Sequence, residues 1–382
     1  MKRENLNKVF LITNIPTPYR IPLFNELDKQ LEEKGLKLKV IFGSLGYRHR
    51  KWEIDLSECK FDFKILPSQC VALFNHEKVL FTYRGLLRLI KKENPKIIIS
   101  NAFSIATTKI WLYSWFRRIR YIIWSGAIES KKRPDSKLRK IQRKLLIKRA
   151  AGFIAYGKKA KEYLINLGAS PEGIEIGINT VDHNFFCEKV KKVRAGLDIT
   201  NNPKNLLFVG HLIKRKRPNL LLELAEILAK KRRDFILKIV GDGPEKKNLV
   251  RLADRLGISE FVTFEGYKQK EELIPYYAEA DCFLFPSEHD VWGLVLAEAM
   301  AAGLPCIATL HAGATCDLIL NGITGFAVDF ENTTEVVRKI EMILDNGRYA
   351  RSIGKEASRF IAEHANLSDC ARGFIRAIEK VG

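Results

Sequence analysis

Short apolar runs alternate with longer amphipathic segments along the chain, and this alternation predicts parallel α/β sheets. In the first half, the apolar runs predict strands at residues 9–12, 37–42, 96–100, 120–124 and 152–155. The amphipathic segments between them predict helices at residues 21–33, 82–92 and 138–149.

The second half repeats the same alternation. Its predicted strands are residues 205–209, 236–240, 262–265, 282–285 and 305–308. Its predicted helices are residues 218–231, 246–256, 271–279 and 294–301, followed by a helical segment at about 346–380.

A charged stretch without apolar periodicity separates the two halves. We therefore expect an N-terminal domain over residues 1–187, a linker over 188–204 and a C-terminal domain over 205–364. We expect the last helix, about 365–382, to pack back on the first domain. Two domains also fit a length of 382 residues, because single domains commonly span roughly 100–200 residues.

Composition limits the class of protein. No run approaches the roughly 20 apolar residues of a membrane span, and no apolar core follows the early basic residues as in a signal peptide. The seven cysteines are scattered, which favours reduced thiols in the cytoplasm and predicts no zinc site.

Charge is distributed unevenly. Residues 1–200 carry 40 Lys and Arg against 19 Asp and Glu, whereas residues 201–382 carry 25 of each. Residues 101–150 alone hold 14 basic and two acidic residues. Such a patch suggests an anionic partner, either a lipid surface, a phosphorylated acceptor or nucleic acid. The alternative is a solvated face that keeps the chain soluble.

Residues 105–120 mix aromatic side chains with a basic end. This composition fits a membrane interface and fits equally a helix buried under the first sheet. The basic run at 131–149 favours the membrane.

Two strand–loop–helix junctions in the second half carry glycine. The first strand ends at Gly210, four cations follow at 214–217, and a helix opens with Pro218. Glycine permits close approach to a ligand and the cations can neutralise a diphosphate, although a solvated basic loop would look the same. The second junction, Gly241-Asp242-Gly243, also fits an ordinary tight turn.

A third junction spans residues 281–303. A buried strand enters an acidic loop, and a helix then begins near Gly293 that is apolar on every side except at Glu298. A buried carboxylate needs partners, which a ribose or a structural Lys or Arg would supply. The helix start at 293–295 offers backbone N–H groups to a phosphate, and Asp290 one turn earlier is placed to contact a sugar.

The spacing Asp290-x7-Glu298, with the flanking sequence VWGLVLAEAMAAGLP, resembles the E-x7-E motif of retaining glycosyltransferases of family 4. Further segments resemble that family in the same order, at residues 179–185, 210–216, 241–244, 264–266, 277–281, 312–317 and 321–326. The first half matches more loosely. Its segment Thr17-Pro18-Tyr19-Arg20 resembles the opening of members that build surface polysaccharides.

The resemblance implies the GT-B fold, with two Rossmann-like α/β domains facing each other across a cleft. It also implies roles for individual residues: Glu298 for the ribose, Lys216 for the diphosphate and Asp290 for the donor sugar, these three being the catalytic candidates. The wider donor-binding set is Gly210, His211, Arg215, Lys216, Gly241, Gly266, Tyr267, Asp290, Gly293, Leu294, Val295 and Glu298. The acceptor-binding set is Thr17, Pro18, Tyr19 and Arg20.

Three departures from the family pattern stand out. Asp290 replaces the first Glu of the motif, and His211 replaces an Arg whose charge Lys214, Arg215 or Arg217 can supply. The strand end at residues 124–129 lacks the family's first-domain His. Ser125 or Glu129 can take a polar role there, and we include Glu129 among the catalytic candidates, although it also fits a helix cap.

By this resemblance the chain is a retaining, hexosyltransferase-like enzyme. It would move a sugar from a nucleotide-sugar to a lipid-linked or polysaccharide acceptor, in cell-envelope biosynthesis on the inner face of the plasma membrane. No Asp-x-Asp motif occurs, so we expect neither a metal ion nor another cofactor. The alternative is a non-catalytic or nucleic-acid-binding basic protein on the same fold, for which no recognition motif is visible.

Overall fold

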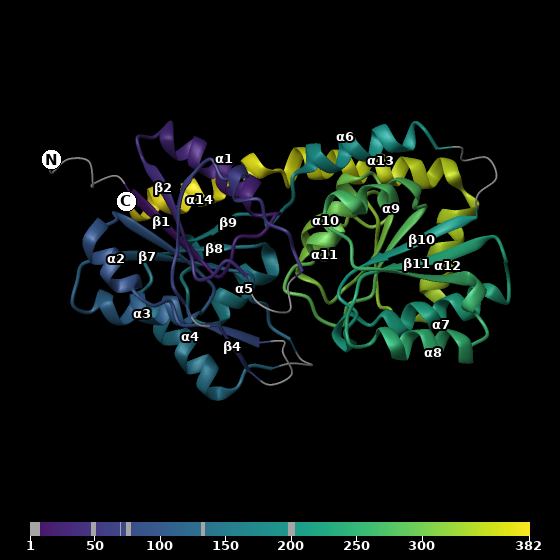
Figure 1. Cartoon of the computed structure of the whole chain (residues 1–382), viewed down its shortest axis with the longest axis horizontal. Coiled ribbons are helices and arrows are strands. Elements are labelled where there is room, and N and C mark those ends of the chain that lie inside the picture. The colour runs from purple at the N-terminus through teal and green to yellow at the C-terminus, as the bar shows by residue number, and fades with distance from the viewer. Residues whose placement is uncertain (1–7, 47–50, 69, 74–77, 131–133, 198–202) are drawn as a thin grey trace. The chain divides into compact units, whose positions relative to one another are not determined.

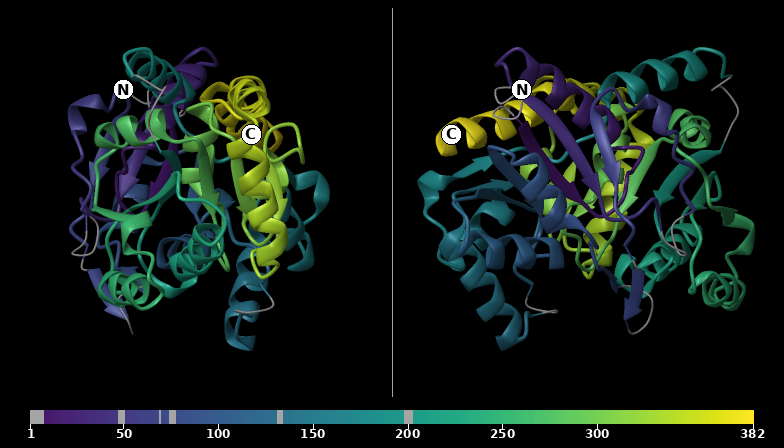
Figure 2. Two further views of the ribbon diagram at one scale, coloured as in Figure 1. Left: turned by 90° about the vertical axis from the view of Figure 1, so that its right-hand side faces the viewer. Right: turned by 60° about the vertical axis from the view of Figure 1, so that its left-hand side comes forward.

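A computed structural model describes residues 8–46, 51–68, 70–73, 78–130, 134–197 and 203–382 (Figure 1). The chain forms two compact units. Unit 1 comprises residues 1–179 and 367–382, and unit 2 comprises residues 180–366. Each unit has its own parallel sheet with helices on both faces (Figure 2). The predicted pair of Rossmann-like α/β domains is therefore confirmed.

The sheet of unit 1 has seven parallel strands in the order β3-β2-β1-β6-β7-β8-β9. Their bounds are β1 Lys8–Thr13, β2 Lys37–Phe42, β3 Asp62–Ile65, β6 Ile97–Asn101, β7 Arg120–Ser125, β8 Gly152–Ala155 and β9 Ile174–Ile176. The helices are α1 Ile21–Glu32, α2 Leu86–Glu93, α3 Ile105–Ser114, α4 Lys137–Arg149, α5 Lys158–Asn166 and α14 Leu367–Val381.

The central strands of unit 1 are buried on both faces, as strands of a parallel sheet must be when helices cover each side. Every residue of β6 and β8 is buried, and β1 is buried from Val9 onward. The largest fully buried side chain is Trp124, whose ring lies 5.0 Å from that of Phe374 in α14 and 6.2 Å from that of Phe24 in α1.

Helix α14 is an integral part of unit 1. It packs along α1 and against β8 and β9. Arg376 and Lys380 both form ion pairs with Glu175 of β9, and Arg120 donates a hydrogen bond of 2.5 Å to the carbonyl oxygen of Val381. The single helical segment expected at 346–380 is thus two helices, α13 Gly347–His364 in unit 2 and α14 in unit 1.

The sheet of unit 2 has six parallel strands in the order β12-β11-β10-β13-β14-β15. Their bounds are β10 Lys204–Val209, β11 Phe235–Val240, β12 Val262–Gly266, β13 Cys282–Phe285, β14 Cys306–Thr309 and β15 Phe326–Val328. The helices are α6 His183–Arg194, α7 Pro218–Ala229, α8 Lys246–Arg255, α9 Ile274–Glu279, α10 Leu294–Ala301, α11 Gly313–Leu318, α12 Thr333–Asp345 and α13.

The expected linker at 188–204 differs from the structure. Helix α6 runs to Arg194, and Asp182 caps its start by accepting a hydrogen bond of 3.1 Å from the Phe185 backbone N–H. Phe186 and Val190 are buried on one face, so the charged residues between them lie on the outside of an ordinary amphipathic helix. The chain passes from unit 1 to unit 2 before this helix, at 179/180.

Two further differences lie in the first half. Helix α2 begins at Leu86 rather than at residue 82, because Tyr83 and Gly85 have positive φ angles of 47° and 78° that interrupt a helix. A short antiparallel pair, β4 Cys70–Leu73 and β5 Lys78–Phe81, stands apart from the main sheet. Among the described residues, none of the helices is both long and apolar enough to cross a bilayer.

Candidate functional site

Three loops of unit 2 meet at one edge of its sheet. They follow β10, β11 and β13, which are neighbours in the sheet order. Because parallel strands place their carboxyl ends together, the three glycine-bearing or acidic junctions predicted from the sequence lie side by side.

Glycine is required where the first two loops touch. Gly241 has a φ of 147°, and a Cβ atom built on it would lie 1.9 Å from the carbonyl oxygen of Gly210. The Gly210 N–H donates to the Val240 oxygen at 2.9 Å, and the Gly241 N–H donates to the Gly266 oxygen at 2.8 Å. The second junction is therefore more than an isolated tight turn, since its backbone bonds hold the ends of β10, β11 and β12 in one layer.

The cations of the first loop reach the acidic loop after β13. Lys216 forms a short ion pair with the Asp290 carboxylate. Arg215 donates a hydrogen bond of 3.2 Å to the carbonyl oxygen of His289. The side chains of Lys216 and Asp290 are only 15% and 11% exposed, so this pair is largely shielded from water.

Electrostatics fixes Asp290 as a carboxylate. Burial acts to raise the pKa of Asp290, but the Lys216 ammonium, together with Arg215, outweighs burial and the net pKa is lowered. Asp290 is therefore ionised at neutral pH and holds Lys216 in place.

Glu298 lies on α10 with one oxygen engaged. The Tyr277 hydroxyl of α9 donates a hydrogen bond of 2.8 Å to one carboxylate oxygen of Glu298. Burial raises the pKa of Glu298, and this is only partly opposed by Tyr277 and Lys270. Within the described part of the chain, Glu298 forms no ion pair with a Lys or Arg. The structure therefore does not support the alternative in which a structural Lys or Arg neutralises Glu298.

The start of α10 has a special backbone. Gly293 has a φ of 106°, and a Cβ atom there would lie 2.5 Å from the ring of Phe285. Among the residues that the structure describes, no side chain caps the start of α10. Leu294 and Val295 are partly exposed, so the first turn of α10 presents backbone to the same edge of the sheet as Lys216 and Asp290.

The other predicted donor-binding residues have less defined surroundings. His211 is exposed on the loop after β10. Tyr267 follows Gly266 at the end of β12, and its hydroxyl donates a hydrogen bond of 3.2 Å to Gln269. Gly266 has a φ of 74°, which favours glycine there.

Sequence reasoning missed Tyr277 as the partner of Glu298, although it lies in a segment that resembles the family. It also missed three buried polar groups close in sequence to the site. The Ser287 hydroxyl, the Trp292 indole N–H and the Thr315 hydroxyl are buried and have no hydrogen-bond partner among the described residues. No pattern in the sequence distinguishes these side chains from ordinary loop and helix residues.

The predicted acceptor segment lies in unit 1. Arg20 donates hydrogen bonds to the Thr13 hydroxyl at 2.8 Å and to the Tyr156 hydroxyl at 2.7 Å. Its guanidinium stacks over the Trp124 ring at 4.5 Å. The Thr17 carbonyl accepts the Arg20 N–H at 2.9 Å. These contacts hold residues 17–20, including Pro18 and Tyr19, in a turn at the carboxyl end of β1.

Glu129 also belongs to unit 1, whereas Lys216, Asp290 and Glu298 belong to unit 2. Glu129 is exposed and accepts a hydrogen bond of 3.5 Å from Asn166. The side chain that caps α4, the next helix along the chain, is that of Ser136. The Ser125 hydroxyl accepts the Ala127 N–H at 3.1 Å.

The unit 2 arrangement defines what can bind there. Cations, a carboxylate with a depressed pKa and a carboxylate with a raised pKa lie along one sheet edge beside exposed backbone. This combination suits an anion joined to hydroxyl-bearing rings. Across the described ranges, no group of three or more His, Cys, Asp or Glu side chains is arranged to hold a metal ion.

Comparison with known proteins shows which family the second half of the chain resembles. Residues 189–360 match the model of the family described as Glycosyl transferases group 1. The chain is 31% identical over 222 residues to D-inositol 3-phosphate glycosyltransferase of Mycobacterium sp. (strain KMS), covering 56% of this chain and 49% of the relative. It is 30% identical over 192 residues to N-acetyl-alpha-D-glucosaminyl L-malate synthase of Bacillus anthracis, a match that covers 50% of this chain and 49% of that relative. The chain thus spans about half the length of the curated relatives it matches.

Similarity of structure extends over the whole chain. HepE of Anabaena, solved in complex with UDP, superposes with a TM-score of 0.77 over 98% of this chain and 100% of that chain, at 17% identity. At this identity the similarity shows the fold alone, which is the predicted GT-B fold.

Proposed function

We propose that the protein is a glycosyltransferase that moves a sugar from a nucleotide-sugar donor to an acceptor. The observation that supports this proposal most directly is the contact of Lys216 with Asp290, inside the segment that matches Glycosyl transferases group 1 and beside the loop contact of Gly210 and Gly241. A diphosphate bound at this edge would meet a cation, and the rings on either side of it would meet carboxylates.

The proposed donor chemistry assigns one task to each side chain. Lys216 exchanges its bond to Asp290 for one to the diphosphate, and stabilises the charge that develops on the leaving phosphate. Asp290 is then released to accept hydrogen bonds from hydroxyls of the donor sugar. The second carboxylate oxygen of Glu298, opposite the one that Tyr277 holds, accepts hydrogen bonds from the ribose.

The stereochemistry and the metal requirement follow from the resemblance to family 4 and belong to the proposal. The anomeric configuration is retained, and the leaving phosphate takes the proton of the acceptor hydroxyl. Lys216 and Arg215 supply the positive charge that a metal ion supplies in other transferases. We expect activity to survive excess EDTA; loss of activity that Mn²⁺ restores would contradict this. The coupling constant of the product's anomeric proton tests retention.

Calorimetry with UDP-, GDP- and ADP-sugars tests the donor site. We expect one nucleotide to bind, and Lys216→Ala to weaken its binding by about tenfold or more, since a charge-assisted contact is lost. Lys355→Ala, which removes an exposed cation from α13 of the same unit, is the matched control. If no nucleotide-sugar binds the wild-type protein, the proposal is wrong.

We further propose a lipid-linked or polysaccharide acceptor at the cytoplasmic face of a membrane. The support is an exposed surface of unit 1, here called the α3–α4 surface. It comprises Leu112, Trp115, Phe116, Leu138, Ile141 and Leu145. Helix α3 buries Ala106, Thr107 and Ile110 on its other face, and Arg149 of α4 lies 4.5 Å from the Trp115 ring centroid. Exposed apolar side chains within a basic helix suit an anionic lipid surface.

Sedimentation with vesicles of phosphatidylglycerol and phosphatidylcholine tests the membrane proposal. We expect the triple variant Leu138→Gln, Ile141→Gln, Leu145→Gln to lose binding. The matched control is Leu310→Gln, Leu320→Gln, Ile323→Gln, which removes three exposed apolar side chains from unit 2. Equal binding of both triple variants would contradict a membrane role for this surface.

A further inference from the structure

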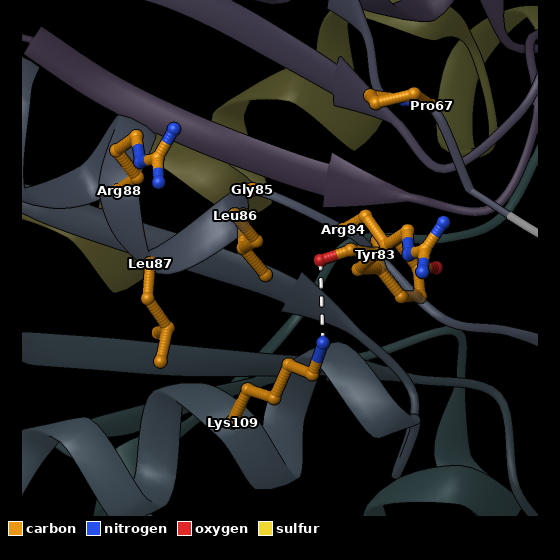
Figure 3. A pocket seen from close by; sticks show the side chains of 8 residues that line it. All are labelled: Pro67, Tyr83, Arg84, Gly85, Leu86, Leu87, Arg88 and Lys109. Atoms are coloured by element: carbon orange, nitrogen blue, oxygen red, sulfur yellow. Dashed lines mark hydrogen bonds between the residues drawn. The ribbon is translucent and has the colours of Figure 1, made fainter.

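Unit 1 has a pocket of about 480 Å³ beside Tyr83 (Figure 3). The guanidinium groups of Arg84 and Arg88 point to opposite sides, and the Lys109 ammonium donates a hydrogen bond of 3.3 Å to the Tyr83 carbonyl oxygen. These cations therefore do not surround a common point. In unit 2, by contrast, defined contacts surround Glu298 and lead to a residue beyond the predicted donor-binding set.

Helix α10 exposes one narrow face. Leu294, Val295 and Glu298 are partly exposed, whereas the other residues of the helix are buried. Residues three and four apart lie on the same face of a helix, so Glu298 follows the first turn on the face that this turn exposes. Glu298 can therefore be reached by a ligand that contacts the first turn of α10.

Tyr277 approaches Glu298 from the interior of unit 2. Its side chain is fully buried, and its hydroxyl donates the hydrogen bond of 2.8 Å to one carboxylate oxygen of Glu298. Among the residues that the structure describes, no other side chain donates a hydrogen bond to this carboxylate. One oxygen is thus held from the inside, and the other remains for a ligand at the exposed face.

The Tyr277 ring is itself fixed. The ring of Phe186 in α6 packs edge-on against it at a centroid distance of 5.9 Å, and the ring of Phe283 in β13 lies at 6.3 Å. Arg194, at the end of α6, donates hydrogen bonds of 3.1 Å to the carbonyl oxygens of Tyr277 and Ala278 in α9. These contacts leave the hydroxyl little freedom to follow a moving carboxylate, so the carboxylate conforms to the hydroxyl.

The same hydrogen bond acts on the charge of Glu298. Burial raises the pKa of Glu298, and the Tyr277 hydroxyl and the Lys270 ammonium oppose this rise. Lys270 acts through space, since its ammonium lies over the Phe185 ring at 3.7 Å from the ring centroid. Cys306 of β14 also acts on Tyr277, and burial raises the pKa of its thiol, which is therefore neutral at pH 7. Tyr277 thus both orients the carboxylate and favours its ionised form.

We propose that Tyr277 is a positioning residue of the donor site, whose hydroxyl holds the Glu298 carboxylate so that its second oxygen meets the ribose of the donor. This inference rests on the proposed function, because that function assigns Glu298 to the ribose. A carboxylate with one oxygen already fixed loses less conformational freedom when a ligand binds than one that can rotate. Tyr277 acts through Glu298 rather than by contact with the nucleotide, since its own side chain is fully buried.

Calorimetry of the full-length chain with UDP, GDP and ADP tests this role through Tyr277→Phe, which removes only the hydroxyl. We expect the variant to bind nucleotide about fivefold more weakly at pH 7, because a hydrogen bond to a charged group is lost. The matched control is Tyr276→Phe, which removes the neighbouring hydroxyl of α9 and its 3.0 Å hydrogen bond to Glu265. Equal losses in the two variants, or no loss in Tyr277→Phe, would overturn the proposal.

Two readouts separate positioning from a general loss of structure. Without its donor, the Glu298 carboxyl group has a still higher pKa. The affinity of Tyr277→Phe should therefore decline at a higher pH than that of the wild type as the pH is lowered from roughly 9 to 5. The preference for each nucleotide over its 2′-deoxy form should also shrink, because the misplaced carboxylate contacts the ribose hydroxyls less well. A pH profile and a deoxy preference that both match the wild type would contradict a role through Glu298.

Glu298→Gln supplies a second background, which keeps the test decisive if Tyr277→Phe folds poorly. Glutamine carries no charge for the hydroxyl to stabilise, so adding Tyr277→Phe should weaken binding by less than about twofold further. A loss in this background as large as about fivefold would show that Tyr277 acts by another route, and the proposal is then wrong.

The outcome for the wild type separates this inference from the proposed function. If nucleotide binds and Tyr277→Phe changes neither the affinity nor its pH dependence, the positioning role fails and the proposed function stands. If none of UDP, GDP and ADP binds the wild-type protein, the positioning role and the proposed function are both wrong.

Discussion

At the scale of single residues, the site of unit 2 contains two carboxyl groups whose pKa values are shifted in opposite directions. Lys216 stabilises the ionised form of Asp290. Within the described part of the chain, only the Tyr277 hydroxyl donates a hydrogen bond to Glu298, and burial raises the pKa of Glu298. A buried ionised group without a full set of partners weakens the fold that contains it. Such a group is retained in proteins when a ligand completes its hydrogen bonds.

The first prediction concerns Glu298→Gln. Because folding raises the pKa of Glu298, the folded protein favours the protonated carboxyl group. The stability that protonated Glu298 contributes is fully present below its pKa in the unfolded chain, and it is lost as the pH rises through its pKa in the folded protein. Glutamine mimics the protonated form. We therefore expect the variant to melt about 2 °C or more above the wild type at pH 7 and to match it near pH 4.

Nucleotide binding should respond in the opposite direction. Glu298→Gln should bind the preferred nucleotide about tenfold more weakly, because an ionised acceptor of ribose hydrogen bonds becomes neutral. Calorimetry and thermal melting of the same sample measure both effects. A variant that is less stable than the wild type at pH 7, or binds nucleotide equally well, would contradict the assigned role.

The second prediction concerns Gly241→Ala. The added Cβ would lie 1.9 Å from the Gly210 carbonyl oxygen, so the loops after β10 and β11 must separate. We expect a loss of at least about 2 kcal/mol in the unfolding free energy and loss of nucleotide binding. Gly347→Ala is the control, since its Cβ would meet only Arg351 at 3.5 Å. Equal denaturation midpoints for the two variants would refute the packing argument.

At the scale of elements, the apolar runs predicted the long buried strands of both sheets, because a strand that is buried on both faces is a nearly continuous run of apolar residues. The edge strands β3, β9 and β15 escaped prediction, since they have three or four residues and fewer buried positions. The loops of the candidate site were located by glycine at strand ends. The ion pair of Lys216 with Asp290 could not be predicted. It joins the loops after β10 and β13, and the sequence does not show that these two strands are neighbours in the sheet.

Helix α14 provides the third prediction. Phe374 is fully buried against Trp124 and lies 3.2 Å from a Cβ built on Gly177. Phe374→Ala should lower the unfolding free energy of unit 1 by about 3–5 kcal/mol. Four of the five tryptophans lie in unit 1, so intrinsic fluorescence during denaturation follows that unit. Phe116→Ala, which truncates a phenylalanine 84% exposed in the same unit, should have little effect.

At the scale of the whole molecule, the division of charge coincides with the division of structure. Unit 1 holds 39 Lys and Arg against 18 Asp and Glu, whereas unit 2 holds 26 of each. The entire net charge of +21 therefore belongs to unit 1, which carries the α3–α4 surface. From the sequence we predicted the charge asymmetry by halves and the packing of the last helix on the first domain, whereas the division of the C-terminal helical segment into α13 and α14 became apparent only from the structure.

The fourth prediction concerns salt. Each basic residue near an anionic bilayer contributes about 1 kcal/mol to binding, and this attraction is screened within about 10 Å at 0.1 M salt. We expect binding to phosphatidylglycerol vesicles to fall by about tenfold or more as salt rises from roughly 0.05 to 0.5 M. Vesicles of phosphatidylcholine alone are the control. Binding that is equal on both lipids, or insensitive to salt, would contradict an electrostatic attachment.

The position of α14 along the chain has a consequence for synthesis in the cell. The strands of unit 1 leave the ribosome before all of unit 2, and α14 emerges after it. At translation rates of about 5–20 residues per second, the apolar surface of β8 and α1 that α14 covers remains exposed for roughly 10–40 s. During that interval we expect a chaperone or another segment of the nascent chain to cover this apolar surface. Unit 2, whose residues are contiguous, can complete its own folding first.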